Sequence, residues 1–146
     1  MRIHIQNENV SAEINTLGAE LVSFKGSDGF EHIWQGDPKY WGGQAPVLFP
    51  IVGALRGGRT RIKGKWFEMN RHGFVRRREF TVAEKRGDAV SLVVEGDAES
   101  KKQYPYDFRF TVTYTLTGSS ITTEFKVENT GGEPLPFCVG DRKSVV

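Results

Sequence analysis

Apolar and polar residues alternate strictly along much of this chain, and this period-two pattern limits the fold more than any other feature. One face of the segment from 108 to 116 is apolar throughout: Phe108, Phe110, Val112, Tyr114 and Leu116. After a turn at Gly118 the alternation resumes with Ile121, Thr123, Phe125 and Val127. Because successive side chains of a strand point to opposite faces, the two runs predict an antiparallel pair with one buried and one solvated face.

Similar alternation between turn signals predicts the other strands. They are expected at Arg2–Gln6, Ser11–Asn15, Glu20–Lys25, Glu31–Trp34, Thr60–Lys63, Lys65–Met69, Glu79–Glu84 and Val90–Glu95. No segment longer than about ten residues has helical periodicity. The 17 glycines and the aromatic fraction of 12% also suit strands joined by many turns. The pattern therefore predicts an all-β protein, an antiparallel β-sandwich.

Composition narrows the expected partners. The net charge of +2 gives no argument for nucleic acid, and no apolar stretch reaches 18 residues, so neither a nucleic-acid nor a membrane partner is predicted. The single cysteine, Cys138, has no internal disulfide partner, which favours the cytoplasm. His4, His32 and His72 are far apart in the sequence, and neither a metal nor a cofactor motif is present.

The central segment from Ala45 to Phe74 carries the strongest functional signal. An apolar run leads through a glycine-rich turn to a short hairpin around Gly64, and the segment ends on Asn70-Arg71-His72-Gly73-Phe74. This order predicts one imidazole, with arginines close by, at the edge of a sheet. Histidine suits general acid–base work because both of its protonation states are accessible near neutral pH.

Three sequence words in this region resemble a known superfamily. They read IWQGDP.YW from Ile33, AP.LFPIVG.L from Ala45 and HGF.R from His72. In this order and spacing they resemble the galactose mutarotase-like (aldose 1-epimerase) superfamily, and most closely its LacX-like branch. The resemblance implies the N-terminal half of a supersandwich. It also implies an isomerase that interconverts the α and β anomers of an aldohexose by acid–base ring opening, without a cofactor.

The resemblance also implies roles for individual residues. His72 matches the first active-site histidine of the superfamily and is the predicted catalytic residue. The predicted substrate contacts are Arg76, Asn70, Arg71, Arg56, Trp41 and Tyr104. Three of these have a structural alternative: turn stabilisation for Asn70, a core position for Trp41, and a plain loop-to-strand turn for Tyr104.

The match extends from about Ile3 to Gly140 and covers only the N-terminal half of the family. The expected organisation is a partial domain over 1–140 and a non-family tail over 141–146. The family's second histidine is replaced by Asp141-Arg142-Lys143, and its general-base glutamate belongs to the other half. Impaired mutarotase activity is therefore expected. A non-catalytic carbohydrate-binding module, and a truncated fragment that self-associates through open sheet edges, remain alternatives.

Basic residues are concentrated around the central hairpin. The run contains Arg56, Arg59, Arg61, Lys63, Lys65, Arg71, Arg76, Arg77 and Arg78, with Glu68 as the only acid. A solvated hairpin face explains this run most simply. A hexose phosphate and a nucleic-acid backbone are the alternatives, because arginine forks match phosphate oxygens.

Overall fold

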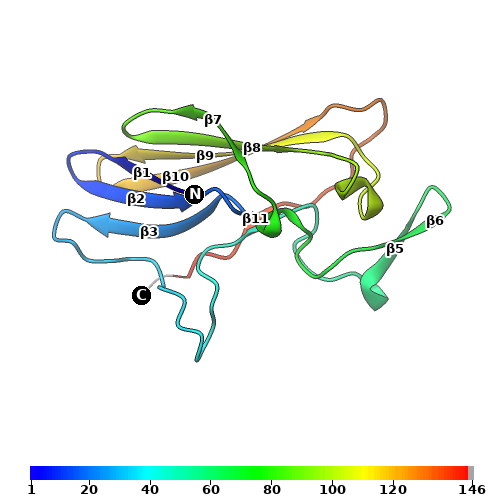
Figure 1. Cartoon of the computed structure of the whole chain (residues 1–146), viewed down its shortest axis with the longest axis horizontal. Helices are drawn as coiled ribbons and strands as arrows, with labels where there is room; N and C mark the ends of the chain where they lie inside the picture. Colours follow the sequence, from blue (N-terminus) through cyan, green and yellow to red (C-terminus); the bar gives the residue numbers. More distant parts are fainter. Residues whose placement is uncertain (145–146) are drawn as a thin grey trace.

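The computed structural model describes residues 1–144 and is almost entirely β, built from antiparallel sheets, so the predicted fold class is confirmed (Figure 1). The first sheet has the order β1 (Arg2–Gln6), β2 (Val10–Asn15), β3 (Glu20–Gly26). The second has the order β10 (Ser120–Asn129), β9 (Phe108–Thr117), β8 (Ala89–Glu95), β7 (Thr81–Lys85). The short pairs are β4 (Val47–Leu48) with β11 (Gly140–Asp141), and β5 (Arg59–Ile62) with β6 (Lys65–Glu68). Within residues 1–144 there are also three 3-10 turns: η1 (Arg56–Gly58), η2 (Val75–Arg77) and η3 (Ser100–Lys102).

The core lies between the two larger sheets, which form separate layers in Figure 1. Every apolar side chain of β9 is buried, as its alternation predicted. The hydroxyl of Tyr114, on β9, donates a hydrogen bond of 2.8 Å to the carbonyl of Ala19 and so links the layers. Strand β10 pairs with β9 on one side only, and its apolar residues are therefore half-buried.

One local prediction was wrong, and one strand was not predicted. Glu31–Trp34 does not form a regular strand and contributes only isolated bridges, such as Lys25 with Glu31. Val47–Leu48 is a strand that the continuous apolar run concealed, and it pairs with Gly140–Asp141 across the predicted boundary of the tail. In both places pairing depends on neighbours that local periodicity does not reveal.

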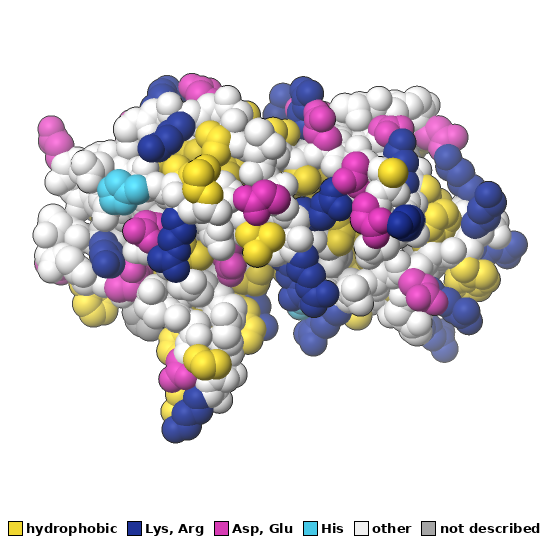
Figure 2. Space-filling view, in the orientation of Figure 1, with side chains coloured by type: hydrophobic (Ala, Val, Ile, Leu, Met, Phe, Trp, Pro, Cys, Tyr) yellow, Lys and Arg dark blue, Asp and Glu magenta, His cyan; other side chains and the backbone are white. Residues whose placement is uncertain are grey.

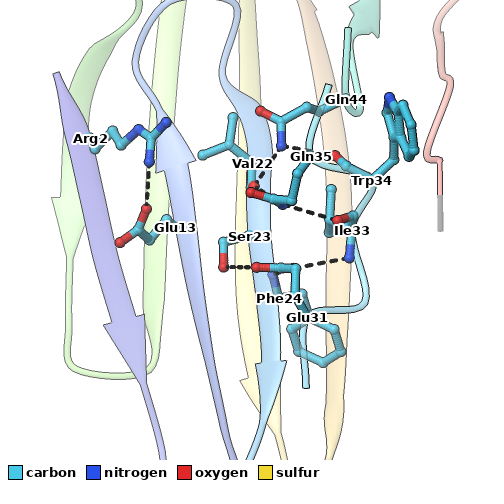
Figure 3. Close-up of polar contacts among 10 residues, drawn as sticks. All are labelled: Arg2, Glu13, Val22, Ser23, Phe24, Glu31, Ile33, Trp34, Gln35 and Gln44. Atoms are coloured by element: carbon cyan, nitrogen blue, oxygen red, sulfur yellow. Dashed lines mark hydrogen bonds and ion pairs between the residues drawn. The ribbon is translucent and has the colours of Figure 1, made fainter. Parts of the chain in front are cut away.

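Along the edge of β3 that has no full partner strand, a side-chain carboxylate makes hydrogen bonds in place of regular strand pairing (Figure 3). The carboxylate of Glu31 accepts hydrogen bonds from the Ser23 hydroxyl at 2.5 Å, the Phe24 amide at 2.8 Å and the Ile33 amide at 3.0 Å. Charged acceptors make stronger hydrogen bonds than neutral ones. Glu31 thus fastens the start of the following loop to the sheet.

Nearer the end of the same loop, amide side chains make further hydrogen bonds to β3 (Figure 3). The Gln44 amide donates to the Val22 carbonyl at 2.8 Å and to the Trp34 carbonyl at 2.9 Å. One carboxylate oxygen of Glu20 accepts the backbone N–H groups of Gln44 and Ala45. The loop from 31 to 45 projects from the sheets (Figure 1). Side-chain hydrogen bonds nevertheless fix both of its ends to β3.

Among residues 1–144, no helix is long and apolar enough to cross a membrane.

Replacing Glu31 with Gln is expected to lower the free energy of unfolding by about 1–3 kcal/mol, because an amide cannot accept all three hydrogen bonds. Burial alone raises the pKa of Glu31, but the hydrogen bonds from Ser23, Phe24 and Ile33 outweigh it, and the pKa lies below its usual 4.5. The folded state therefore gains stability above the unfolded pKa and loses it as the pH falls through the lower, folded value. Urea unfolding at pH 7 and at steps below 4.5 will measure this, and the Gln variant should show a shallower loss in acid.

Glu13→Gln is the matched control. Glu13 forms an exposed ion pair with Arg2 at 3.1 Å in the same sheet (Figure 3). Exposed pairs contribute roughly 0–1 kcal/mol, so this variant should change stability little. Equal losses from both variants would contradict the role assigned to Glu31.

Candidate functional site

The segment carrying His72 runs between β6 and η2 in a tightly fixed backbone conformation. Both His72 and Gly73 have a φ of 71°, in the left-handed region that favours glycine. The His72 amide donates to the Gly53 carbonyl at 2.8 Å, and the Phe74 amide donates to the Phe49 carbonyl at 3.1 Å. A non-glycine residue held in this conformation indicates that the surroundings determine the position of the imidazole.

The approach of Gly73 to the neighbouring chain is close enough to require glycine. A Cβ built at this position would lie 2.1 Å from the Phe49 carbonyl oxygen and 2.8 Å from the Pro50 nitrogen. Gly73 and Phe49 also form an isolated parallel bridge. The HGF word therefore contains a glycine because two backbones meet there.

The imidazole of His72 is oriented by a single backbone contact. Its Nδ1 forms a short hydrogen bond with the Val52 carbonyl. Because a carbonyl oxygen only accepts, Nδ1 carries the hydrogen, and Nε2 is left to meet a ligand. In the neutral ring Nε2 accepts a proton, and in the cation it donates one.

His72 lies in a pocket of about 210 Å³. The lining residues come from four segments of the chain: Trp41, Pro46, Leu48, Arg71, His72, Arg76 and Arg142. Trp41, Pro46 and Leu48 supply an apolar wall, and the remaining residues supply hydrogen-bond donors. This combination suits a small ligand with both C–H faces and oxygen atoms.

Trp41 reaches the pocket because the preceding loop is braced. The indole N–H of Trp34 donates to the Trp41 carbonyl at 2.8 Å. On the other side, the guanidinium of Arg142 stacks over the Trp41 ring, 4.4 Å from its centroid. Trp34 thus has a structural role, and Trp41 faces the pocket.

The structure brings together three of the six predicted substrate contacts, since Trp41, Arg71 and Arg76 all line the pocket with His72. Asn70 lines an adjoining hollow of about 680 Å³, which shares Arg71 with the first pocket. Arg56 is exposed in η1 and lines neither hollow.

Tyr104 lies elsewhere, in the aromatic core. Its side chain is buried, and its hydroxyl donates to the Pro136 carbonyl at 2.7 Å. Burial, with a smaller contribution from Tyr106, raises the pKa of Tyr104, so the hydroxyl stays protonated. The His72 pocket does not include Tyr104.

Sequence reasoning missed Arg142, Pro46 and Leu48. Pro46 and Leu48 belong to the AP.LFPIVG.L word, and its match to the superfamily could have indicated that they lie near the site. Arg142 belongs to the segment predicted as a non-family tail, where no pattern indicated a role. It comes close to Trp41 because its amide donates to the Pro46 carbonyl at 3.1 Å, directly after β11.

Within residues 1–144, no three His, Cys, Asp or Glu side chains gather in an arrangement that would hold an ion. The side chains that line the His72 pocket supply an imidazole, guanidinium groups and an indole.

Comparison with known proteins defines the class of protein. The sequence model of the aldose 1-epimerase family matches residues 1–141, and the chain belongs to this family. Two curated relatives, the plasmid-encoded and the chromosomal protein LacX of Lactococcus lactis subsp. lactis, are each 42% identical over an alignment of 146 positions that covers 96% of this chain. The chain spans about half of their length, 49%.

Solved structures agree. A galactose mutarotase related enzyme from Lactobacillus acidophilus superposes with a TM-score of 0.98 at 34% identity, over 99% of this chain and 49% of that one. A galactose mutarotase-like protein from Lactobacillus casei gives 0.93 at 34% identity, over 97% and 48%. The superfamily and the LacX-like branch that the three sequence words indicated are confirmed.

Replacing Gly73 with Ala should lower the free energy of unfolding by more than about 3 kcal/mol, because the new Cβ must displace backbone atoms of Phe49 and Pro50. The same substitution should also disturb the backbone that holds His72. Urea unfolding measures the first effect, and the chemical shifts of the His72 imidazole report the second.

Gly64→Ala separates the clash from backbone strain. Gly64 has a φ of 80°, but nothing lies within 4 Å of the added Cβ. This variant should cost only about 1–2 kcal/mol, the price of a left-handed alanine. If the two variants lose the same stability, the close contact at Gly73 is not what requires glycine.

Proposed function

We propose that this chain binds an aldohexose in the His72 pocket and provides the acid side of an aldose 1-epimerase reaction. The observation that carries the proposal is the placement of His72. Its ring is fixed through Nδ1, and it lines a pocket that combines an indole wall with guanidinium donors. Membership of the aldose 1-epimerase family supports a sugar as the ligand.

The proposed chemistry opens and recloses a pyranose ring. A base takes the proton from the hydroxyl on C1, and the electron pair forms the aldehyde C=O as the bond from C1 to the ring oxygen breaks. The acid, the Nε2–H of protonated His72, gives its proton to the ring oxygen. Rotation about the bond between C1 and C2, followed by the reverse proton transfers, closes the ring with the other configuration at C1.

Only one of the two proton carriers is assigned to this chain. The family resemblance implies that the general base lies in the other half of the fold, and that the second histidine is replaced here by Asp141-Arg142-Lys143. A missing acid or base costs typically about 10²–10⁴ in rate. We therefore propose that the 146-residue chain binds sugar but accelerates mutarotation weakly.

The single cysteine supports one further part of this proposal. Cys138 is free and exposed, which suits a reducing compartment, so we place the protein in the cytoplasm.

A second candidate function, assembly with another polypeptide, is favoured by strand β10. Ile121, Phe125 and Val127 form a half-buried apolar row on this edge strand. An unpaired edge exposes N–H and C=O groups that can extend a sheet between molecules. Pairing of two copies through β10 is the proposed form of self-association.

The sugar proposal is tested by binding and rate measurements on the same protein. Titration with glucose and galactose, followed by NMR, should shift the His72 imidazole signals, and His72→Ala should weaken binding by about tenfold or more. Polarimetry with α-glucose and α-galactose should show a small acceleration that disappears in the same variant. His4→Ala, on the exposed face of β1, is the matched control and should change neither quantity.

Each outcome separates the candidate functions. Sugar binding without any His72-dependent acceleration would identify a carbohydrate-binding module. Absence of sugar binding in the folded protein would overturn the proposal altogether.

Self-association has its own measurement. Sedimentation velocity across a hundredfold range of protein concentration should reveal dimers, and Ile121→Lys should shift the equilibrium to monomers. Thr122→Lys, on the solvated face of the same strand, should not. A monomer at every concentration would exclude pairing through β10.

A further inference from the structure

The His72 pocket has a strongly one-sided charge. Arg71, Arg76 and Arg142 all line it, and its lining includes no Asp or Glu side chain. Guanidinium groups stay charged at any physiological pH, so three positive charges share a pocket of about 210 Å³. Like charges held this close repel one another, and an anion would relieve the repulsion.

Internal ion pairs do not neutralise these arginines. Among residues 1–144, ion pairs engage Arg2, Arg78, Arg86 and Arg109, but none of the three pocket arginines. Asp141, which precedes Arg142 in the sequence, pairs with Lys143. The positive charge of the pocket therefore remains available to a ligand.

Arg76 gives the most specific indication. Its Nη2 donates to the Arg71 carbonyl at 3.3 Å, while its Nε is fully buried and has no hydrogen-bond partner in the described chain. A buried donor without a partner costs free energy, and an acceptor supplied by a bound ion or water is one arrangement that removes this cost.

The basic residues of the β5–β6 hairpin, by contrast, are exposed to solvent and do not line the pocket. Lys and Arg side chains gather around β5–β6 at one end of the molecule (Figure 2). There Arg59 stacks on the exposed ring of Trp66, 4.6 Å from its centroid, and Arg61 donates to the Gly64 carbonyl. These residues form the solvated face that the sequence predicted, whereas Arg71, Arg76 and Arg142 converge on a concave site.

From this geometry we infer that the aldohexose bound at His72 carries a phosphate. The inference rests on the proposed function and names its substrate class. A phosphate brings about −1.5 to −2 charges and three acceptor oxygens, which match guanidinium forks. Ring opening requires a free hydroxyl at C1, so the phosphate is attached to another oxygen of the sugar, such as that on C6. The indole of Trp41 then meets the C–H face of the ring, while the arginines hold the phosphate.

The test compares four ligands on the 146-residue protein by isothermal titration calorimetry: glucose 6-phosphate, glucose, glucuronate and inorganic phosphate. Glucose 6-phosphate should bind about 10–100-fold more tightly than glucose, because each charge-assisted hydrogen bond contributes roughly tenfold. This advantage should shrink as the salt concentration rises. Glucose should bind equally well at all salt concentrations.

Arginine variants locate the phosphate. Arg71→Gln and Arg76→Gln should bring the affinity for glucose 6-phosphate down to that for glucose. Arg77→Gln removes the same charge from the neighbouring exposed position and should have no effect. Because Arg76 also contacts the Arg71 backbone, thermal unfolding of each variant will verify that it is folded, and Arg71→Gln gives an independent test.

The outcomes distinguish this inference from the proposed function. Equal affinity for glucose and glucose 6-phosphate would overturn the phosphate assignment and leave sugar binding intact. Glucuronate binding as tightly as glucose 6-phosphate, or inorganic phosphate binding as tightly as the whole sugar phosphate, would also overturn it. Failure of every sugar to bind would remove both proposals.

Discussion

The contact between Gly73 and the Phe49 carbonyl joins the core of this protein to its candidate site. The ring of Phe49 is completely buried and stacks on Phe110 with centroids 4.8 Å apart. Its carbonyl accepts the Phe74 amide and lies against Gly73. One residue thus packs the sandwich with its side chain and fixes the histidine segment with its backbone, so the position of the imidazole depends on core packing.

The alternation of apolar and polar residues predicted the strands that bury one face, because this two-residue period depends only on the strand itself and not on its partners. Strand β9 is the clearest case. The failures occur where pairing depends on distant partners. The edge of β3 is completed by the carboxylate of Glu31 in place of a strand, and β4 becomes a strand only because Gly140–Asp141 lies beside it. No local pattern distinguishes these situations from a regular ladder or from a buried apolar run.

The candidate site was predictable to the extent that its residues are close in sequence or belong to a recognisable word. His72 and Arg76 satisfy both conditions, and Arg71 satisfies the first. The sequence favoured a pocket position and a core position for Trp41 equally. The hydrogen bond from the Trp34 indole to the Trp41 carbonyl, which the sequence does not reveal, fixes the loop that carries Trp41. Arg142 could not be predicted at all, because its role comes from tertiary pairing.

The stacking of Arg142 on Trp41 couples ligand binding in the pocket to the pairing of β4 with β11. These residues are far apart in the chain and meet only while β11 stays paired with β4, a ladder of two residue pairs. A ligand in the pocket that contacts both of them would stabilise that short ladder. Ligand binding and pairing of the ladder are reciprocally coupled, so a change that opens the ladder weakens ligand binding by the same factor. Exchange of the Gly140 and Asp141 amide hydrogens with solvent deuterium would therefore slow as ligand fills the pocket beside Trp41.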